Sequence, residues 1–97
     1  METTENKRLK ELKKNFHNEL INSLSAIIIK IETKSEITQS NIQKARKSTE
    51  GLIKVYQIEG ELTKKRTLEL LLNHLKRKNL EKFEGELSYI LDIIKNY

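Results

Sequence analysis

The stretch from Phe16 to Glu32, FHNELINSLSAIIIKIE, constrains the fold of this chain more than any other. Its apolar residues recur at spacings of four, three and four, which is typical of an amphipathic helix packed against a core. This stripe consists of Leu20, Leu24, Ile27 and Ile31. Ile28 and Ile29 widen it until the end of the helix is apolar on nearly every side. We therefore expect other helices to cover this one on more than one face.

The composition favours helices along the whole chain. Proline is absent, there are three glycines, and Leu, Ile, Lys and Glu dominate the 97 residues, so we predict an all-α protein. This length is enough for one domain, residues 1–97, with a single modest core. We expect a small antiparallel bundle of about four helices with the first helix longest. The predicted helices span residues 4–32, 36–58, 61–78 and 80–96.

Local signals set these boundaries. Thr33 and Glu36 have the spacing of a capping box before the second helix. The basic run at 76–78 suits the end of the third helix, where the helix dipole is negative. Asn79 is a good N-cap for the fourth helix, so the last two helices are expected to form a tight antiparallel hairpin. Gly51, inside the second helix, predicts a close helix crossing.

Charge and composition limit the class of protein. Nineteen basic residues against 14 acidic ones give a net charge of +5, which fits both ordinary solubility and binding of polyanions. The chain has no cysteine and therefore no disulfide or thiolate metal site. We expect no membrane span, because about 18 consecutive apolar residues are needed, and no export, because METTENKRLK lacks an apolar signal core. The predicted location is the cytoplasm, and the Lys, Ile and Asn content suggests a bacterial or phage source.

The string HNELINSLSAI, from His17 to Ile27, resembles the dimerisation helix of sensor histidine kinases, which in one large group reads H-D-E-L-G-Q-S-L-T-A-I. The resemblance covers residues 17–32 and implies a dimeric helical hairpin with a histidine that accepts a phosphoryl group. By this resemblance the acceptor is His17, Glu19 is a neighbouring acid, and Asn22 replaces the glutamine that positions water.

Two features of the sequence differ from those of the kinases. Asn18 stands where those kinases usually carry an acidic residue, and no Gly-rich nucleotide loop follows. The phosphoryl group would therefore come from another protein. The alternative is a structural role, in which His17 is half-buried beside Phe16 at the edge of the stripe.

Two basic clusters provide a second alternative function. The clusters are Lys64, Lys65 and Arg66, and Lys76, Arg77 and Lys78. They lie near opposite ends of the third predicted helix and would make salt-dependent contacts with the phosphates of a nucleic acid. Aromatic residues that stack on bases are scarce nearby, the nearest being Phe83. A solvated charged face explains the same clusters.

No catalytic motif or metal-ligand spacing stands out, so we predict a protein that is not an enzyme and has no cofactor or metal. His74 and His17 have no carboxylate pair beside them at ligand spacing. We predict an interaction module that binds another protein, as a regulator, adaptor or immunity-type factor. Its size, basicity and helical pattern resemble those of small bacteriocin immunity proteins. We also predict a homodimer through the first helix, with an interface of Leu20, Leu24, Ile27, Ile28 and Ile31.

Overall fold

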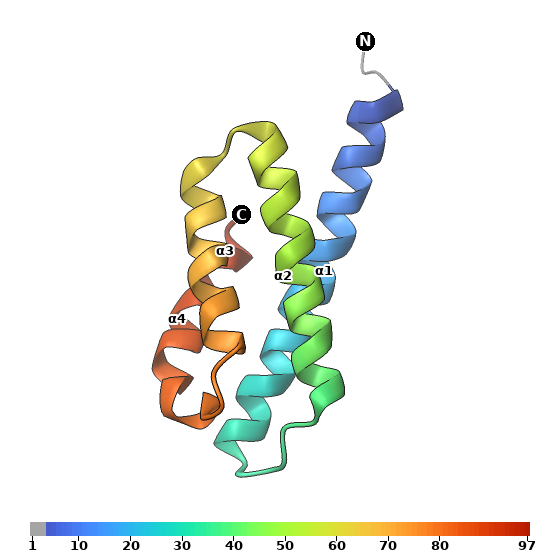
Figure 1. Ribbon diagram of the computed structural model, residues 1–97. Coiled ribbons are helices and arrows are strands. Elements are labelled where there is room, and N and C mark those ends of the chain that lie inside the picture. The colour runs from blue at the N-terminus through green and yellow to red at the C-terminus, as the bar shows by residue number, and fades with distance from the viewer. Residues whose placement is uncertain (1–3) are drawn as a thin grey trace.

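Helices account for nearly all of residues 4–97, the part of the chain that this computed structural model describes. They are α1 (Thr4–Glu32), α2 (Gln39–Glu59), α3 (Leu62–Leu75) and α4 (Glu84–Lys95), with a short 3-10 helix, η1 (Leu80–Phe83), before α4. Successive helices run in opposite directions (Figure 1), and no strand occurs among the described residues. The predicted all-α bundle with a long first helix is confirmed.

The core lies where all four helices meet. From α1 it takes the predicted stripe, since Leu20, Leu24 and Ile27 have no exposed surface. The other helices supply residues that are equally buried: Ala45, Leu52, Leu68, Leu71, Leu87 and Ile94. Burying one such leucine or isoleucine side chain stabilises the fold by about 1.5–3 kcal/mol. The periodicity of the apolar residues therefore determines which face of each helix points inward.

The contact between α1 and α2 includes an aromatic ring over a glycine. A Cβ atom placed on Gly51 would lie 2.7 Å from the ring of Phe16, closer than packed atoms approach one another. The close approach predicted at Gly51 is therefore made by a side chain of α1 and not by its backbone.

The second helix begins three residues later than predicted. Thr38 is its N-cap, with an extended backbone and a side-chain oxygen that accepts a hydrogen bond from the Asn41 amide at 3.3 Å. The Thr33 hydroxyl instead donates to the Ile29 carbonyl at 2.9 Å, at the end of α1. The predicted capping box of Thr33 and Glu36 is therefore wrong, because Thr33 belongs to the end of the preceding helix. Residues 33–38 form the α1–α2 loop.

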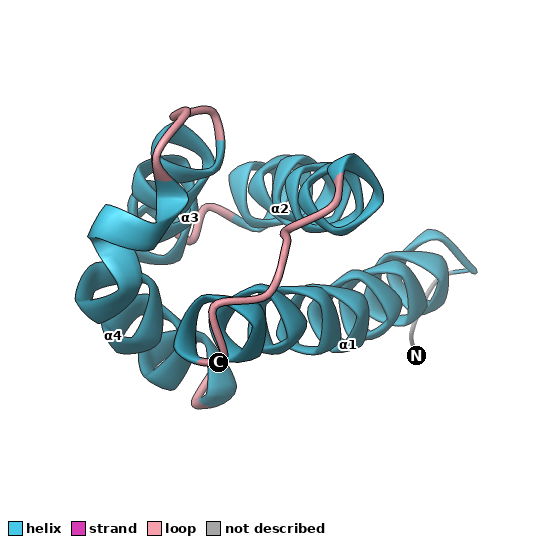
Figure 2. Ribbon diagram, turned by 90° about the horizontal axis from the view of Figure 1, so that it is seen from below, coloured by secondary structure: helices cyan, strands magenta, loops and turns pink. Residues whose placement is uncertain are grey.

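The third helix ends at Leu75, three residues earlier than predicted. Leu75 and Leu80 are both buried, at 2% and 3% exposure, but residues five apart lie about 140° apart on a helix. The chain therefore turns between them, and Asn79 makes no side-chain capping bond. Helix α4 lies between α3 and α1 (Figure 2). It contacts α3, from which η1 separates it in the chain, and packs more extensively on α1.

None of the helices within residues 4–97 has both the length and the apolar character required to cross a membrane.

Candidate functional site

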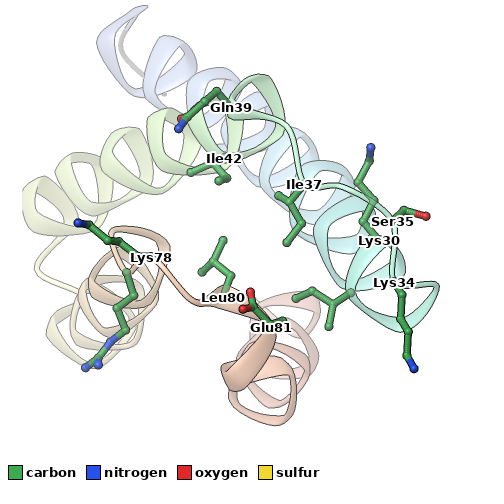
Figure 3. A pocket seen from close by; sticks show the side chains of 11 residues that line it. Lys30, Lys34, Ser35, Ile37, Gln39, Ile42, Lys78, Leu80 and Glu81 are labelled. Atoms are coloured by element: carbon green, nitrogen blue, oxygen red, sulfur yellow. The ribbon is translucent and has the colours of Figure 1, made fainter.

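The α1–α2 loop and the connection from α3 to η1 come together at one end of the bundle (Figure 1), and their residues line an open cleft there (Figure 3). Its volume is about 520 Å³, within the range typical of ligand sites. We call it the terminal cleft. Its lining consists of an aliphatic floor, a rim of four cations, and the side chains of Ser35, Gln39 and Glu81.

The floor is aliphatic and is assembled from separate segments. It consists of Ile31 at the end of α1, Ile37 in the α1–α2 loop, Ile42 in α2 and Leu80 in η1. The side chains of Ile37, Ile42 and Leu80 converge on the middle of the opening (Figure 3). Leu80 is buried beneath the others, whereas the three isoleucines are only half-buried. The floor therefore offers apolar surface to a side chain that enters from outside.

The rim of the terminal cleft is basic. Its cations are Lys30, Lys34, Arg77 and Lys78. Two of them are held within the chain: Lys30 donates to the Glu36 carbonyl at 3.1 Å, and the Arg77 guanidinium lies 4.8 Å from the centre of the Phe83 ring. Lys34 and Lys78 stand on opposite sides of the opening (Figure 3), and no hydrogen bond or ion pair within residues 4–97 engages their ammonium groups. Both are available to a ligand.

The remaining polar groups of the cleft are a carboxylate, a hydroxyl and an amide, from Glu81, Ser35 and Gln39. The Glu81 carboxylate turns toward the opening (Figure 3). The Ser35 hydroxyl shares a hydrogen bond of 2.8 Å with that of Thr33, and no imidazole or thiol is part of the described lining. The arrangement can bind a group that is apolar at its centre and acidic at its edges.

His17 lies elsewhere and makes a tertiary contact. Its Nε2 atom is 2.8 Å from the Ile94 carbonyl oxygen near the end of α4. A carbonyl oxygen only accepts, so Nε2 carries the hydrogen and donates it. The side chain is half-buried, as the structural interpretation expects, and the bond joins residues 77 positions apart. The nitrogen is therefore occupied by a contact that fastens α4 to α1.

The other residues of the kinase resemblance face away from His17. Glu19 and Asn22 line a separate shallow cleft with Ser23, Ala26, Asn41 and Lys44, and His17 is not part of it. Successive residues lie about 100° apart on a helix, so positions 17 and 19 point in nearly opposite directions. Glu19 and Asn22 are not brought to the imidazole.

The predicted dimer interface forms the core of the single chain. Leu20, Leu24 and Ile27 are fully buried, and Ile28 is 7% exposed. Ile31 is half-buried in the floor of the terminal cleft. Four of the five predicted interface residues are thus buried within the chain, where α2 and α4 pack against α1. Ile29 is the one residue of this run that is largely exposed, at 56%.

The two basic clusters have different surroundings. Lys64 lies 5.5 Å from the ring centre of Tyr56 and 5.3 Å from that of Tyr97, and Lys65 pairs with Glu69 at 3.6 Å. Arg66 is exposed. At the other end of α3, Lys76, Arg77 and Lys78 follow the helix, and the last two join the rim of the terminal cleft. The second cluster therefore contributes two residues to the terminal cleft, whereas Arg66 of the first lines a separate open cleft with Glu69, Leu70 and Asn73.

His74 packs against an aromatic ring. Its ring centre lies 5.1 Å from that of Phe83, and its buried Nδ1 has no hydrogen-bond partner among the described residues. Within residues 4–97, no group of three or more His, Cys, Asp or Glu side chains is placed to hold a metal ion. The second histidine is a packing residue in this structure.

Comparison with known proteins gives no relative. No family model matches the chain, and no match was found among curated proteins or solved structures.

The terminal cleft itself is a feature that sequence reasoning missed. Its lining combines residues 30–42 with residues 77–81, and neither stretch carries a recognisable motif. The available signal was Ile37, an apolar residue between two polar turns, with Ile42 five positions further on.

Proposed function

We propose that this protein is a non-catalytic helical module that binds another protein, as a regulator, adaptor or immunity-type factor, and that the terminal cleft is the binding site. One observation carries the proposal: aliphatic side chains from separate segments converge on the floor of a cleft that is open to solvent. An apolar side chain entering the cleft removes its own surface and that of the floor from water, at about 25 cal/mol per Å².

The position of the cleft also supports this function. The floor lies between two loops at one end of the bundle, and loops on a rigid scaffold are common places for recognition. The scaffold beneath is fixed, since Leu80 packs into the core that the four helices share. A site of this kind binds a partner without a large change in the bundle.

The proposal is tested by selecting binders from a random-peptide phage library against the immobilised chain. We expect enriched peptides to contain aliphatic residues and to lose binding to Ile37→Asp, which places a charge on the floor. Ile58→Asp is the matched control, because Ile58 is 72% exposed at the far end of α2. Circular dichroism of both variants verifies the fold. A library that yields no binders, or binders that tolerate Ile37→Asp, contradicts the proposal.

Nucleic-acid binding is the alternative for the basic residues. Here Lys76, Arg77 and Lys78 with the cations of the rim give it partial support, because they gather positive charge at one end of the molecule. Such binding weakens steeply as salt rises, since each neutralised phosphate releases counterions. Titration of a labelled oligonucleotide at several salt concentrations distinguishes it from the binding of a peptide.

The homodimer and the cytoplasmic location remain predictions from the sequence. Light scattering tests the first, and its interface would have to use residues other than the buried stripe of α1.

A further inference from the structure

We propose that the segment bound in the terminal cleft is an acidic stretch of a protein partner, with an aliphatic anchor at its centre and carboxylates on both sides of it. This inference rests on the proposed function and specifies the chemistry of the partner. It follows from the charged residues that surround the aliphatic floor, which are Lys34, Lys78 and Glu81.

The charge of the rim defines the flanks of the ligand. Lys34 and Lys78 have no ionic partner within residues 4–97 and stand across the opening from one another (Figure 3). Their ammonium groups are directed outward on the two sides (Figure 3), so the two ends of a segment that extends beyond the opening pass them. Carboxylates before and after the anchor would pair with them, and complementary charge raises the association rate and fixes the register of the bound segment.

Glu81 defines the centre of the ligand. Its carboxylate is the one acidic group in the described lining, and it turns toward the middle of the opening (Figure 3). Like charges side by side cost free energy, so an acidic residue is disfavoured over the floor and favoured at the rim. The pattern acidic, aliphatic, acidic follows from the positions of Glu81, Lys34 and Lys78.

The same surroundings disfavour nucleic acid as the occupant. Bases bind by stacking on aromatic faces, and the floor is aliphatic. Phe83, three residues after Leu80, is already contacted by the Arg77 guanidinium and by the His74 ring. Glu81 would also repel phosphates. The cleft therefore matches a peptide better than an oligonucleotide.

The test uses fluorescence anisotropy with the full chain and four labelled probes. The first is a peptide in which leucine and isoleucine are flanked by aspartates on both sides. The second has lysines for the aspartates, the third has serines for the leucine and isoleucine, and the fourth is a single-stranded DNA. We expect binding of the first probe alone.

Variants that change charge show where the first probe binds. Lys34→Glu with Lys78→Glu is expected to weaken the first probe by about tenfold or more, since exposed ion pairs each contribute up to about 1 kcal/mol. Lys47→Glu with Lys54→Glu makes the same change of net charge on an exposed part of α2 outside the cleft and should leave affinity nearly unchanged. Glu81→Gln is expected to tighten the acidic peptide severalfold, because it removes a repulsion.

The outcomes separate this inference from the proposed function. Selected peptides that are aliphatic but lack carboxylates, and that bind equally to Lys34→Glu with Lys78→Glu, overturn the acidic partner and leave protein binding in place. Binding of the DNA alone overturns both. Loss of the acidic peptide in the rim variant, with affinity retained in the α2 control and tightened by Glu81→Gln, supports the inference.

Discussion

The ring of Phe16 fills the space that the missing side chain of Gly51 leaves between α1 and α2. Three ring atoms lie 2.7–2.8 Å from the place where a Cβ atom would be. The glycine thus has a packing role in the middle of a helix, where it otherwise costs about 1 kcal/mol relative to alanine. The two residues are coupled, and the coupling is measurable.

We expect Gly51→Ala to lower the free energy of unfolding by about 1–2 kcal/mol, because the new methyl group displaces the Phe16 ring at a cost that exceeds the gain in helix propensity. In the Phe16→Leu background, which lacks the clashing ring atoms, the same change should be neutral or stabilising. Urea denaturation of the four chains measures both effects as a double-mutant cycle.

Gly85→Ala is the matched control for that cycle. It lies in the first turn of α4, and a Cβ atom there meets nothing within 4 Å. We expect it to raise stability by up to about 1 kcal/mol. Equal responses at Gly51 and Gly85 would mean that the ring moves aside freely and that no coupling exists.

Removal of the His17 ring should loosen the end of α4. His17→Ala removes the donor to the Ile94 carbonyl and part of a half-buried side chain, at an expected cost of about 1–2 kcal/mol. Hydrogen exchange should become faster in the last turn of α4, while exchange in α2 follows only the change in global stability. Asn18→Ala, at the exposed neighbouring position, serves as the control.

We expect no phosphoryl transfer to His17. Its Nε2 donates to a carbonyl, and Glu19 and Asn22 line another cleft. The measurement is acid-labile labelling after incubation with phosphorylated kinases and response regulators. Stoichiometric label that disappears in His17→Gln, with the fold intact by circular dichroism, would establish the phosphotransfer alternative instead.

Adjacent isoleucines at the end of α1 should respond very differently to the same charge. Ile28 is 7% exposed and Ile29 is 56% exposed. Ile28→Glu places a carboxylate in the core and should cost about 3–5 kcal/mol or prevent folding, whereas Ile29→Glu should change stability by no more than about 0.5 kcal/mol. Thermal melts with light scattering report both stability and mass. If Ile28→Glu melts like the parent chain and only lowers its mass, the stripe is an intermolecular interface after all.

Stability should fall at alkaline pH because of Tyr56. Burial, together with the Glu59 carboxylate, Tyr97 and Glu61, raises the pKa of this phenol from 10.0 to about 12. The folded chain thus holds the proton more tightly than the unfolded chain does. The stability from this group is complete below about pH 10 and is lost as the pH rises through about 12.

Tyr56→Phe keeps the ring and removes the titrating group, so its stability should decline less over this range. Tyr89→Phe, at a position that is 69% exposed, is the control. Denaturant midpoints measured along a pH series give the comparison. Parallel curves for the parent chain and Tyr56→Phe would assign the alkaline loss to other groups.

Periodicity made the buried face of α1 predictable, because a helix repeats at 3.6 residues and apolar positions follow that repeat. Leu20, Leu24 and Ile27 are buried as a consequence. The end of α3 was harder to predict from the sequence. The run at 76–78 contains no glycine or proline, and lysine and arginine favour helix ends, so nothing local stops the helix at Leu75. The stop comes from tertiary packing, since Leu80 has to reach the core.

The candidate site depended even more on tertiary structure. Lys34 and Lys78 become neighbours of one cleft only because the bundle places two loops at the same end. Sequence reasoning assigned Lys78 to a cluster on α3 and gave Lys34 no role. It also assigned the stripe of α1 to a dimer interface, whereas Leu20, Leu24, Ile27 and Ile28 are buried within the single chain.

The position of α4 has a consequence for the order of folding. It is synthesised after α1, α2 and α3, yet it packs on α1, and the bond from His17 to the Ile94 carbonyl spans 77 positions. A nascent chain that has reached only α3 therefore leaves one side of the stripe on α1 bare, and such surfaces promote aggregation. Contacts between residues so far apart in the sequence also slow folding. Translation that is interrupted before Glu84 should release a helical but self-associating intermediate.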